Sequence, residues 1–156
     1  MHSNIIQISR NPIDIEEWVS PSNFYENSSD FADYIGEEMD DEEREEVILW
    51  MVSDFGGIFT LEDDHLVFNG LGEFTKEWYE YIRECVAQLK DGEVDDMKLY
   101  KINKAVERTH LGIHSRFYIE NWNGYAAPVE DFIAYLQKQM KVGDRLYIGS
   151  VIDYHF

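Results

Sequence analysis

The chain ends in the sequence LYIGSVIDYHF, residues 146–156, and this stretch indicates the fold more clearly than any other. Apolar side chains alternate along it with polar or small ones. The apolar set is Leu146, Ile148, Ile152, Tyr154 and Phe156, and between them lie Tyr147, Gly149, Asp153 and His155. A period of two residues is typical of a β-strand with one buried face. Residues 5–9 form another β-prone run, and we expect the two to pair.

The segments between these two runs predict a mixture of strands and helices. Residues 58–68 read as a hairpin whose turn is Glu62-Asp63-Asp64, and residues 116–119 read as a strand. We expect helices over five stretches: from Ser28 or Ser29 to Gly36, about 40–55, Thr75 to about 91, Asp95 or Asp96 to Gly112, and from Pro128 onward. The predicted class is α+β, with about five helices on a small mixed or antiparallel sheet.

The second of these helices carries the strongest helix-start signal. Asp40 or Asp41 can cap it, and acidic residues crowd its first turn, where they favour the positive end of the helix dipole. Residues 47–52 are apolar on every side of the helix. Such a run predicts a helix that is buried on most of its faces.

Length and composition predict one globular domain over residues 1–156, without a membrane partner. The chain has 156 residues, of which 44% are hydrophobic and 15% aromatic, and this apolar content is enough to form a buried hydrophobic core. No apolar run approaches the roughly 18 residues that a membrane-spanning helix needs. The N-terminal residues show neither the basic nor the long apolar region of a secretory signal. Because Cys85 is the only cysteine, no internal disulfide can form, and we expect a cytoplasmic protein.

The charge is unevenly distributed. The formal net charge is −19, and residues 1–66 account for −16 of it, with 18 acidic and two basic side chains. The opposite bias lies between residues 98 and 116, where Lys98, Lys101, Lys104, Arg108 and Arg116 accompany the single acid Glu107. Such asymmetry steers oppositely charged partners and repels free nucleic acid, which we do not expect this chain to bind.

The densest acidic block, residues 37–46, is the leading candidate site. Its carboxylates are Glu37, Glu38, Asp40, Asp41, Glu42, Glu43, Glu45 and Glu46. We interpret them as a face that binds a basic protein surface, in an inhibitor, an immunity factor or a mimic of the nucleic-acid backbone. The alternative interpretation is a solvated helix-capping surface that keeps the protein soluble. A third hypothesis is a homo-oligomer in which the basic 98–116 segment of one copy meets this block of another.

A different class of function would use aromatic side chains. Trp122 and Tyr125 flank a turn outside the periodic core positions. They predict a recognition loop, or the aromatic pocket of a small-molecule-binding module or enzyme. No catalytic residue, cofactor or metal site is expected, so a binding protein is favoured over an enzyme. Residues 62–65 lack the EF-hand spacing, and His110 and His114 flank Gly112, which interrupts a helical ligand pair.

Overall fold

A seven-stranded mixed sheet forms the centre of the protein. The computed structural model describes residues 1–26, 31–87, 113–122 and 124–156, and the strand count refers to these residues. The strands are β1 (His2–Ser9), β2 (Tyr34–Glu38), β3 (Phe59–Glu62), β4 (His65–Phe68), β5 (Arg116–Ile119), β6 (Ala126–Ala127) and β7 (Arg145–His155). Their order is β3-β4-β7-β1-β5-β6, and β2 also pairs with β7. The α+β class, the hairpin and the C-terminal strand are therefore confirmed.

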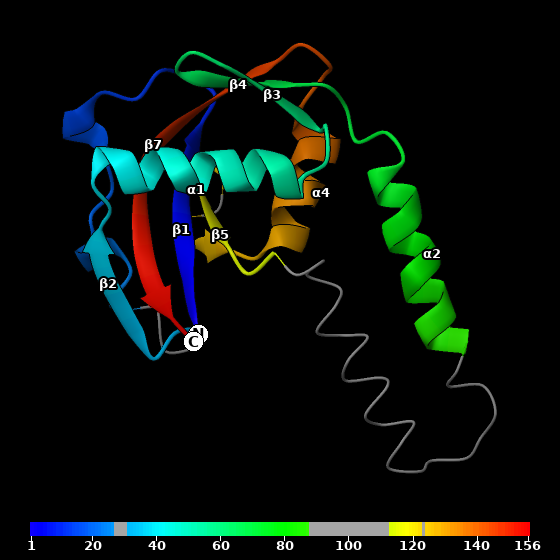
Figure 1. Ribbon diagram of the computed structural model, residues 1–156, viewed down its shortest axis with the longest axis horizontal. Helices are drawn as coiled ribbons and strands as arrows, with labels where there is room; N and C mark the ends of the chain where they lie inside the picture. Colours follow the sequence, from blue (N-terminus) through cyan, green and yellow to red (C-terminus); the bar gives the residue numbers. More distant parts are fainter. Residues whose placement is uncertain (27–30, 88–112, 123) are drawn as a thin grey trace.

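β7 is the strand around which the sheet is organised. It pairs antiparallel with β1 from His2↔His155 to Ser9↔Tyr147, and β1 pairs in parallel with β5. The expected pairing of the two terminal runs is thus confirmed, and the chain ends lie side by side (Figure 1). Along its length β7 also pairs with β4 at residues 145–147 and with β2 at residues 152–155. Residues 148–150 lie between these two pairings.

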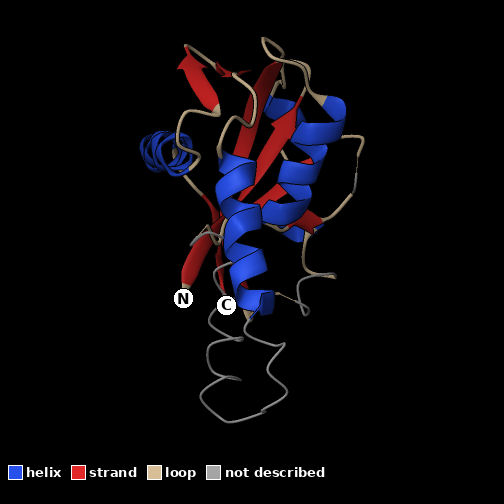
Figure 2. Cartoon of the chain, turned by 90° about the vertical axis from the view of Figure 1, so that its right-hand side faces the viewer, coloured by secondary structure: helices blue, strands red, loops and turns tan. Residues whose placement is uncertain are grey.

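Helices cover the sheet, and the described residues hold fewer α-helices than the five expected for the whole chain. The described residues hold three α-helices, α1 (Asp41–Asp54), α2 (Phe74–Ala87) and α4 (Val129–Gln139), and two short 3-10 helices, η1 (Ile15–Glu17) and η2 (Pro21–Asn23). α1 crosses in front of the sheet strands, and α2 lies along one side of the molecule (Figures 1 and 2). The helix expected at 95–112 lies outside the described residues, as do Ser28, Ser29 and the turn at 91–92.

The expected helix ending at Gly36 was wrong, because residues 34–38 form strand β2. The pairs Tyr34↔His155 and Ile35↔Tyr154 with β7 define this strand, in which Ile35 is buried and Tyr34 is 61% exposed. Gly36 packs against β7 so closely that an added Cβ would lie 2.8 Å from the Asp153 carboxylate. The helix is expected because Phe31, Tyr34 and Ile35 fall at i, i+3 and i+4, the spacing of one helix face. Pairing with β7 overrides this local spacing.

Two hydrophobic clusters form the core, one on each side of the sheet. The larger one joins α1 and α4 to the sheet through Phe55 and Phe132, which both contact Phe117; the Phe117 and Phe132 rings stack with centroids 4.1 Å apart. α1 and α4 therefore cover the same face. The smaller cluster includes Phe24, Ile152 and Tyr154.

Tyr154 makes the stability of this smaller cluster sensitive to alkaline pH. Its hydroxyl donates to the backbone carbonyl of His114, and burial raises the pKa of the phenol above its ordinary value. A raised folded-state pKa adds stability that is fully present below about pH 10 and is lost as the pH rises through the folded-state pKa. Urea denaturation should show that the unfolding free energy falls less between pH 9 and 11 in Tyr154→Phe than in the wild type. Equal losses in both proteins would contradict this role.

Candidate partner-binding face

The acidic face begins where the chain passes from β2 into α1. Asp40 is the N-cap of α1: its carboxylate accepts a hydrogen bond of 2.9 Å from the Glu43 backbone N–H, and the Glu43 carboxylate accepts one of 3.4 Å from the Asp40 N–H. This capping box satisfies donors at the start of the helix. Asp41, Glu42 and Glu43 fill the first turn, at the positive end of the helix dipole. The local sequence thus explains why so many carboxylates are held at one helix end.

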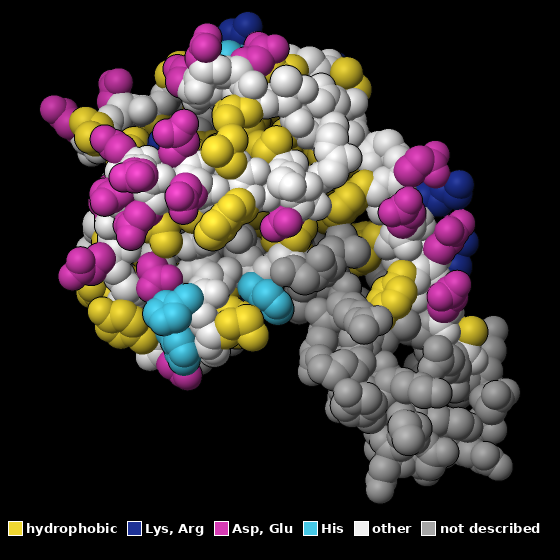
Figure 3. All heavy atoms as spheres, in the orientation of Figure 1, with side chains coloured by type: hydrophobic (Ala, Val, Ile, Leu, Met, Phe, Trp, Pro, Cys, Tyr) yellow, Lys and Arg dark blue, Asp and Glu magenta, His cyan; other side chains and the backbone are white. Residues whose placement is uncertain are grey.

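All eight carboxylates of the block are exposed to solvent, and they gather on one side of the molecule. These are Glu37, Glu38, Asp40, Asp41, Glu42, Glu43, Glu45 and Glu46, which we call the acidic face. Figure 3 shows Asp and Glu side chains clustered over the N-terminal half of α1 and over β2. Within the described residues, no Lys or Arg forms an ion pair with any of them. Eight exposed carboxylates without a described Lys or Arg partner thus make up this face (Figure 3).

Arg44, the only cation within the block, points toward the sheet. Its Nε donates to the carbonyl of Gly149 over 2.7 Å, and a terminal nitrogen donates to the carbonyl of Ile148. The guanidinium also lies 4.9 Å from the centre of the Trp18 ring. Burial lowers the pKa of Arg44 and the nearby Asp41 raises it, but an arginine stays charged at neutral pH. Arg44 thus donates hydrogen bonds to the part of β7 that lies between the residues paired with β4 and those paired with β2.

The outer side of α1 exposes two large apolar side chains that the sequence interpretation had placed in the core. Val47, Ile48 and Met51 are buried as expected, but Leu49 is 52% exposed and Trp50 is 62% exposed. The expected burial on most faces was wrong, because α1 lies on one side of the sheet and its other side remains open to solvent. Helical spacing could have indicated this, since Leu49 and Trp50 follow Glu45 and Glu46 by four residues. An apolar pair therefore borders the acidic face.

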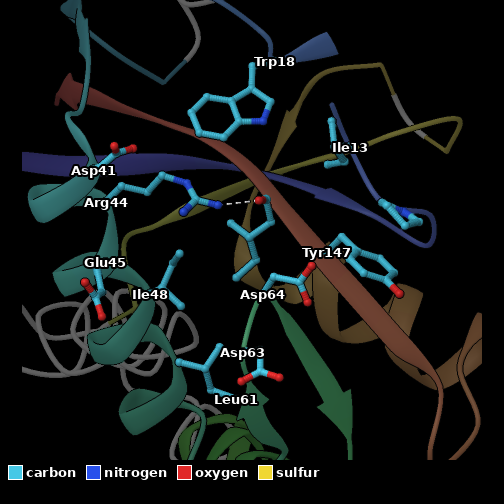
Figure 4. Close-up of a pocket in the computed structure, with 12 residues that line it drawn as sticks. Ile13, Trp18, Asp41, Arg44, Glu45, Ile48, Leu61, Asp63, Asp64 and Tyr147 are labelled. Carbon is cyan, nitrogen blue, oxygen red and sulfur yellow. Dashed lines mark hydrogen bonds between the residues drawn. The ribbon is translucent and has the colours of Figure 1, made fainter. Parts of the chain in front are cut away.

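A groove lies on the other side of α1, between that helix, the β3–β4 turn and the segment before η1 (Figure 4). It encloses about 460 Å³. Trp18, Ile48 and Leu61 contribute to its walls, and β7 lines it with Tyr147 and Ile148. The sequence could not reveal this groove, because its lining comes from five separate stretches between residues 12 and 148.

Of Trp122 and Tyr125, only Trp122 lines the hollow that the described residues form beside β5. Trp122 lines a smaller hollow of about 280 Å³ together with Arg10, Glu120 and Tyr135, and its ring centroid lies 5.2 Å from that of Tyr135. Tyr125 is not among the residues around this hollow. Its hydroxyl donates over 2.7 Å to the Asp131 carboxylate, and this hydrogen bond raises the pKa of the phenol. Trp122 thus lines the hollow together with Tyr135, and Tyr125 lies outside it.

The remaining candidates separate into those that the structure places and those outside the described residues. Arg116 lies on β5, with its guanidinium 4.2 Å from the Phe31 ring centroid and a hydrogen bond of 2.9 Å to the carbonyl of Ala126. His114 is exposed beside Phe156. The rest of the basic segment, at 98–108, and His110 lie outside the described residues. The structure therefore does not test the oligomer hypothesis.

Among the described residues, no three His, Cys, Asp or Glu side chains cluster as metal ligands would. No described helix combines the length and the apolar character needed to cross a bilayer. The chain matches no protein-family model, no curated protein and no solved structure.

Proposed function

We propose that this protein is a non-enzymatic binding protein whose acidic face docks on a basic surface of a partner protein. The observation that supports it is the juxtaposition on α1 of exposed, unpaired carboxylates with the exposed Leu49 and Trp50. Carboxylates at the rim of an interface accelerate and orient the encounter with a basic partner. A large aromatic side chain supplies binding energy once water is excluded. The acidic face provides the acceleration of encounter, and Trp50 provides the binding energy.

The partner class that fits best is a protein that acts on nucleic acid. Such proteins carry clusters of Lys and Arg that neutralise phosphates, and closely spaced carboxylates can occupy the same positions. The proposed role is therefore that of an inhibitor or immunity factor. We place it in the cytoplasm, which the single cysteine of the sequence favours.

Trp50→Ala tests the anchoring role. We expect the affinity for the basic partner to fall about 30-fold or more, because truncating an interface hot spot costs about 2 kcal/mol or more. The unfolding free energy should change by no more than about 0.5 kcal/mol, since the side chain is largely exposed. The partner is captured from the host's cytosol at low salt, eluted with a salt gradient and purified, and its affinity is then measured by calorimetry.

Tyr79→Ala is the matched control, because Tyr79 is an exposed aromatic residue on a different helix, α2. It should leave the affinity within about twofold of the wild type, a change of roughly 0.4 kcal/mol. If Trp50→Ala binds as tightly as Tyr79→Ala, Trp50 is not an anchor and the α1 interface is contradicted.

A second candidate function is small-molecule binding in the hollow beside Trp122. Arg10 and Glu120 provide opposite charges there, and Trp122 and Tyr135 provide aromatic surface. A ligand that binds the native state raises the melting temperature. A thermal-shift screen against metabolites and divalent metals tests this function, and unchanged melting temperatures throughout would contradict it.

A further inference from the structure

The groove beside α1 combines an apolar interior with a negatively charged rim. Ile13, Ile48 and Leu61 line it with aliphatic carbon, and the Trp18 and Tyr147 rings flank it. Figure 4 shows these side chains around a common space, although they come from five separate stretches of the chain. A long aliphatic chain can therefore lie in the groove in contact with carbon.

Four carboxylates surround this interior. Asp41 and Glu45 belong to α1, and Asp63 and Asp64 form the β3–β4 turn; all four are exposed. The only cation in the lining is Arg44, whose guanidinium already donates to the carbonyls of Ile148 and Gly149. Arg44 is thus held against β7, and the rim keeps an excess of negative charge.

We infer that the groove receives a lysine or arginine side chain of the basic partner. Its aliphatic stem would lie along Ile48 and Leu61, and its charged end would meet the carboxylates of Glu45 and the β3–β4 turn. The Asp64 carboxylate already lies 3.0 Å from Nδ1 of His65. A neutral apolar side chain would leave the carboxylates of Glu45 and Asp63 without a cation, and an acidic one would be repelled. This inference rests on the proposed function and specifies what the partner must insert beside α1.

The probe is the blocked pentapeptide acetyl-Gly-Gly-Arg-Gly-Gly-amide, with lysine, citrulline and norleucine in place of arginine in three further peptides. Each is titrated into the ¹⁵N-labelled full-length chain at low salt and followed by NMR. We expect saturable shifts at the Leu61, Asp64 and Tyr147 amides and at the Trp18 indole with the arginine and lysine peptides. Binding of the citrulline and norleucine peptides should be at least tenfold weaker, because they lack the charge.

Asp63→Asn combined with Asp64→Asn tests the rim directly. Asn tolerates the left-handed backbone of Asp63, whose φ is 44°, so the turn is retained. We expect this double variant to bind the arginine peptide about tenfold less tightly. The matched control, Glu77→Gln with Glu80→Gln on α2, removes the same charge away from the groove and should change binding less than twofold.

The shift map separates failure of this inference from failure of the proposed function. Arginine-peptide shifts confined to residues 42–46 and 50 would overturn the groove as the binding site and leave the α1 face as the docking surface. Shifts at neither place would contradict both. Citrulline and arginine peptides that bind the groove equally well would overturn the requirement for a cation.

Discussion

Replacing Glu42, Glu43, Glu45 and Glu46 together with lysine is expected to slow association with the basic partner by ten- to a thousandfold at low salt. Electrostatic steering contributes about this factor to association rates, and each replacement removes a negative charge and adds a positive one. The dissociation rate should change less, because exposed rim charges act mainly on encounter. Stopped-flow or surface plasmon resonance measurements give both rates.

A control is needed because the replacement also changes the overall charge of the molecule. Glu73, Glu77, Glu80 and Glu84 are four exposed glutamates on or beside α2, and their reversal makes an identical change in net charge. We expect the α2 reversal to slow association much less than the α1 reversal. Equal association rates for the two reversed proteins would show that net charge, not the acidic face, governs encounter.

Arg44→Met is expected to lower the unfolding free energy by about 2–4 kcal/mol. The methionine fills part of the same volume but leaves the carbonyls of Ile148 and Gly149 without their donors. Losing hydrogen bonds to a charged group costs about 1.5–3 kcal/mol each, and water entering the groove can recover part of this. The contact with the Trp18 ring is lost as well.

Arg10→Met provides the comparison, measured by urea denaturation at the same pH. Arg10 pairs with Asp144 at 3.0 Å, but half of its side chain is exposed, so its removal should cost about 1 kcal/mol or less. Arg44→Lys should fall between wild type and Arg44→Met, because an ammonium group cannot reproduce the forked geometry. If Arg44→Met is no less stable than Arg10→Met, Arg44 has no special role in holding β7.

Local patterns predicted the elements whose causes are local. The alternation in residues 146–156 indicated β7, the paired apolar runs indicated the β3–β4 hairpin, and the capping signal at Asp40 indicated the start of α1. In each case the signal is carried by a few neighbouring residues: an alternation, a pair of short apolar runs around a turn, or a capping residue. Such signals can be read from one sequence.

Strand β2 and the direction of Arg44 depend on contacts between residues far apart in the chain. Ile35 pairs with Tyr154, and Arg44 bonds to residues 104 and 105 positions away. Nothing in residues 31–44 alone indicates that β7 will be their neighbour. The spacing of Phe31, Tyr34 and Ile35 therefore predicted a helix, and the inward direction of Arg44 could not be predicted.

The candidate site was more readily predicted in its charge than in its apolar part. The acidic block is evident in the sequence of residues 37–46. Leu49 and Trp50 stand in a continuous apolar run, and only their helical spacing from Glu45 and Glu46 indicates that they lie on the exposed side of α1. The groove could not be predicted, because it depends on the β3–β4 turn lying opposite α1.

Hydrogen–deuterium exchange of the protein with and without its purified basic partner tests the central claim most directly. We expect slower exchange in the complex over residues 41–54 and 59–68, with residues 74–87 and the turn at 121–125 unchanged. Slower exchange confined to the turn at 121–125, or to α2, would place the partner elsewhere and contradict the acidic face of α1 as the docking surface.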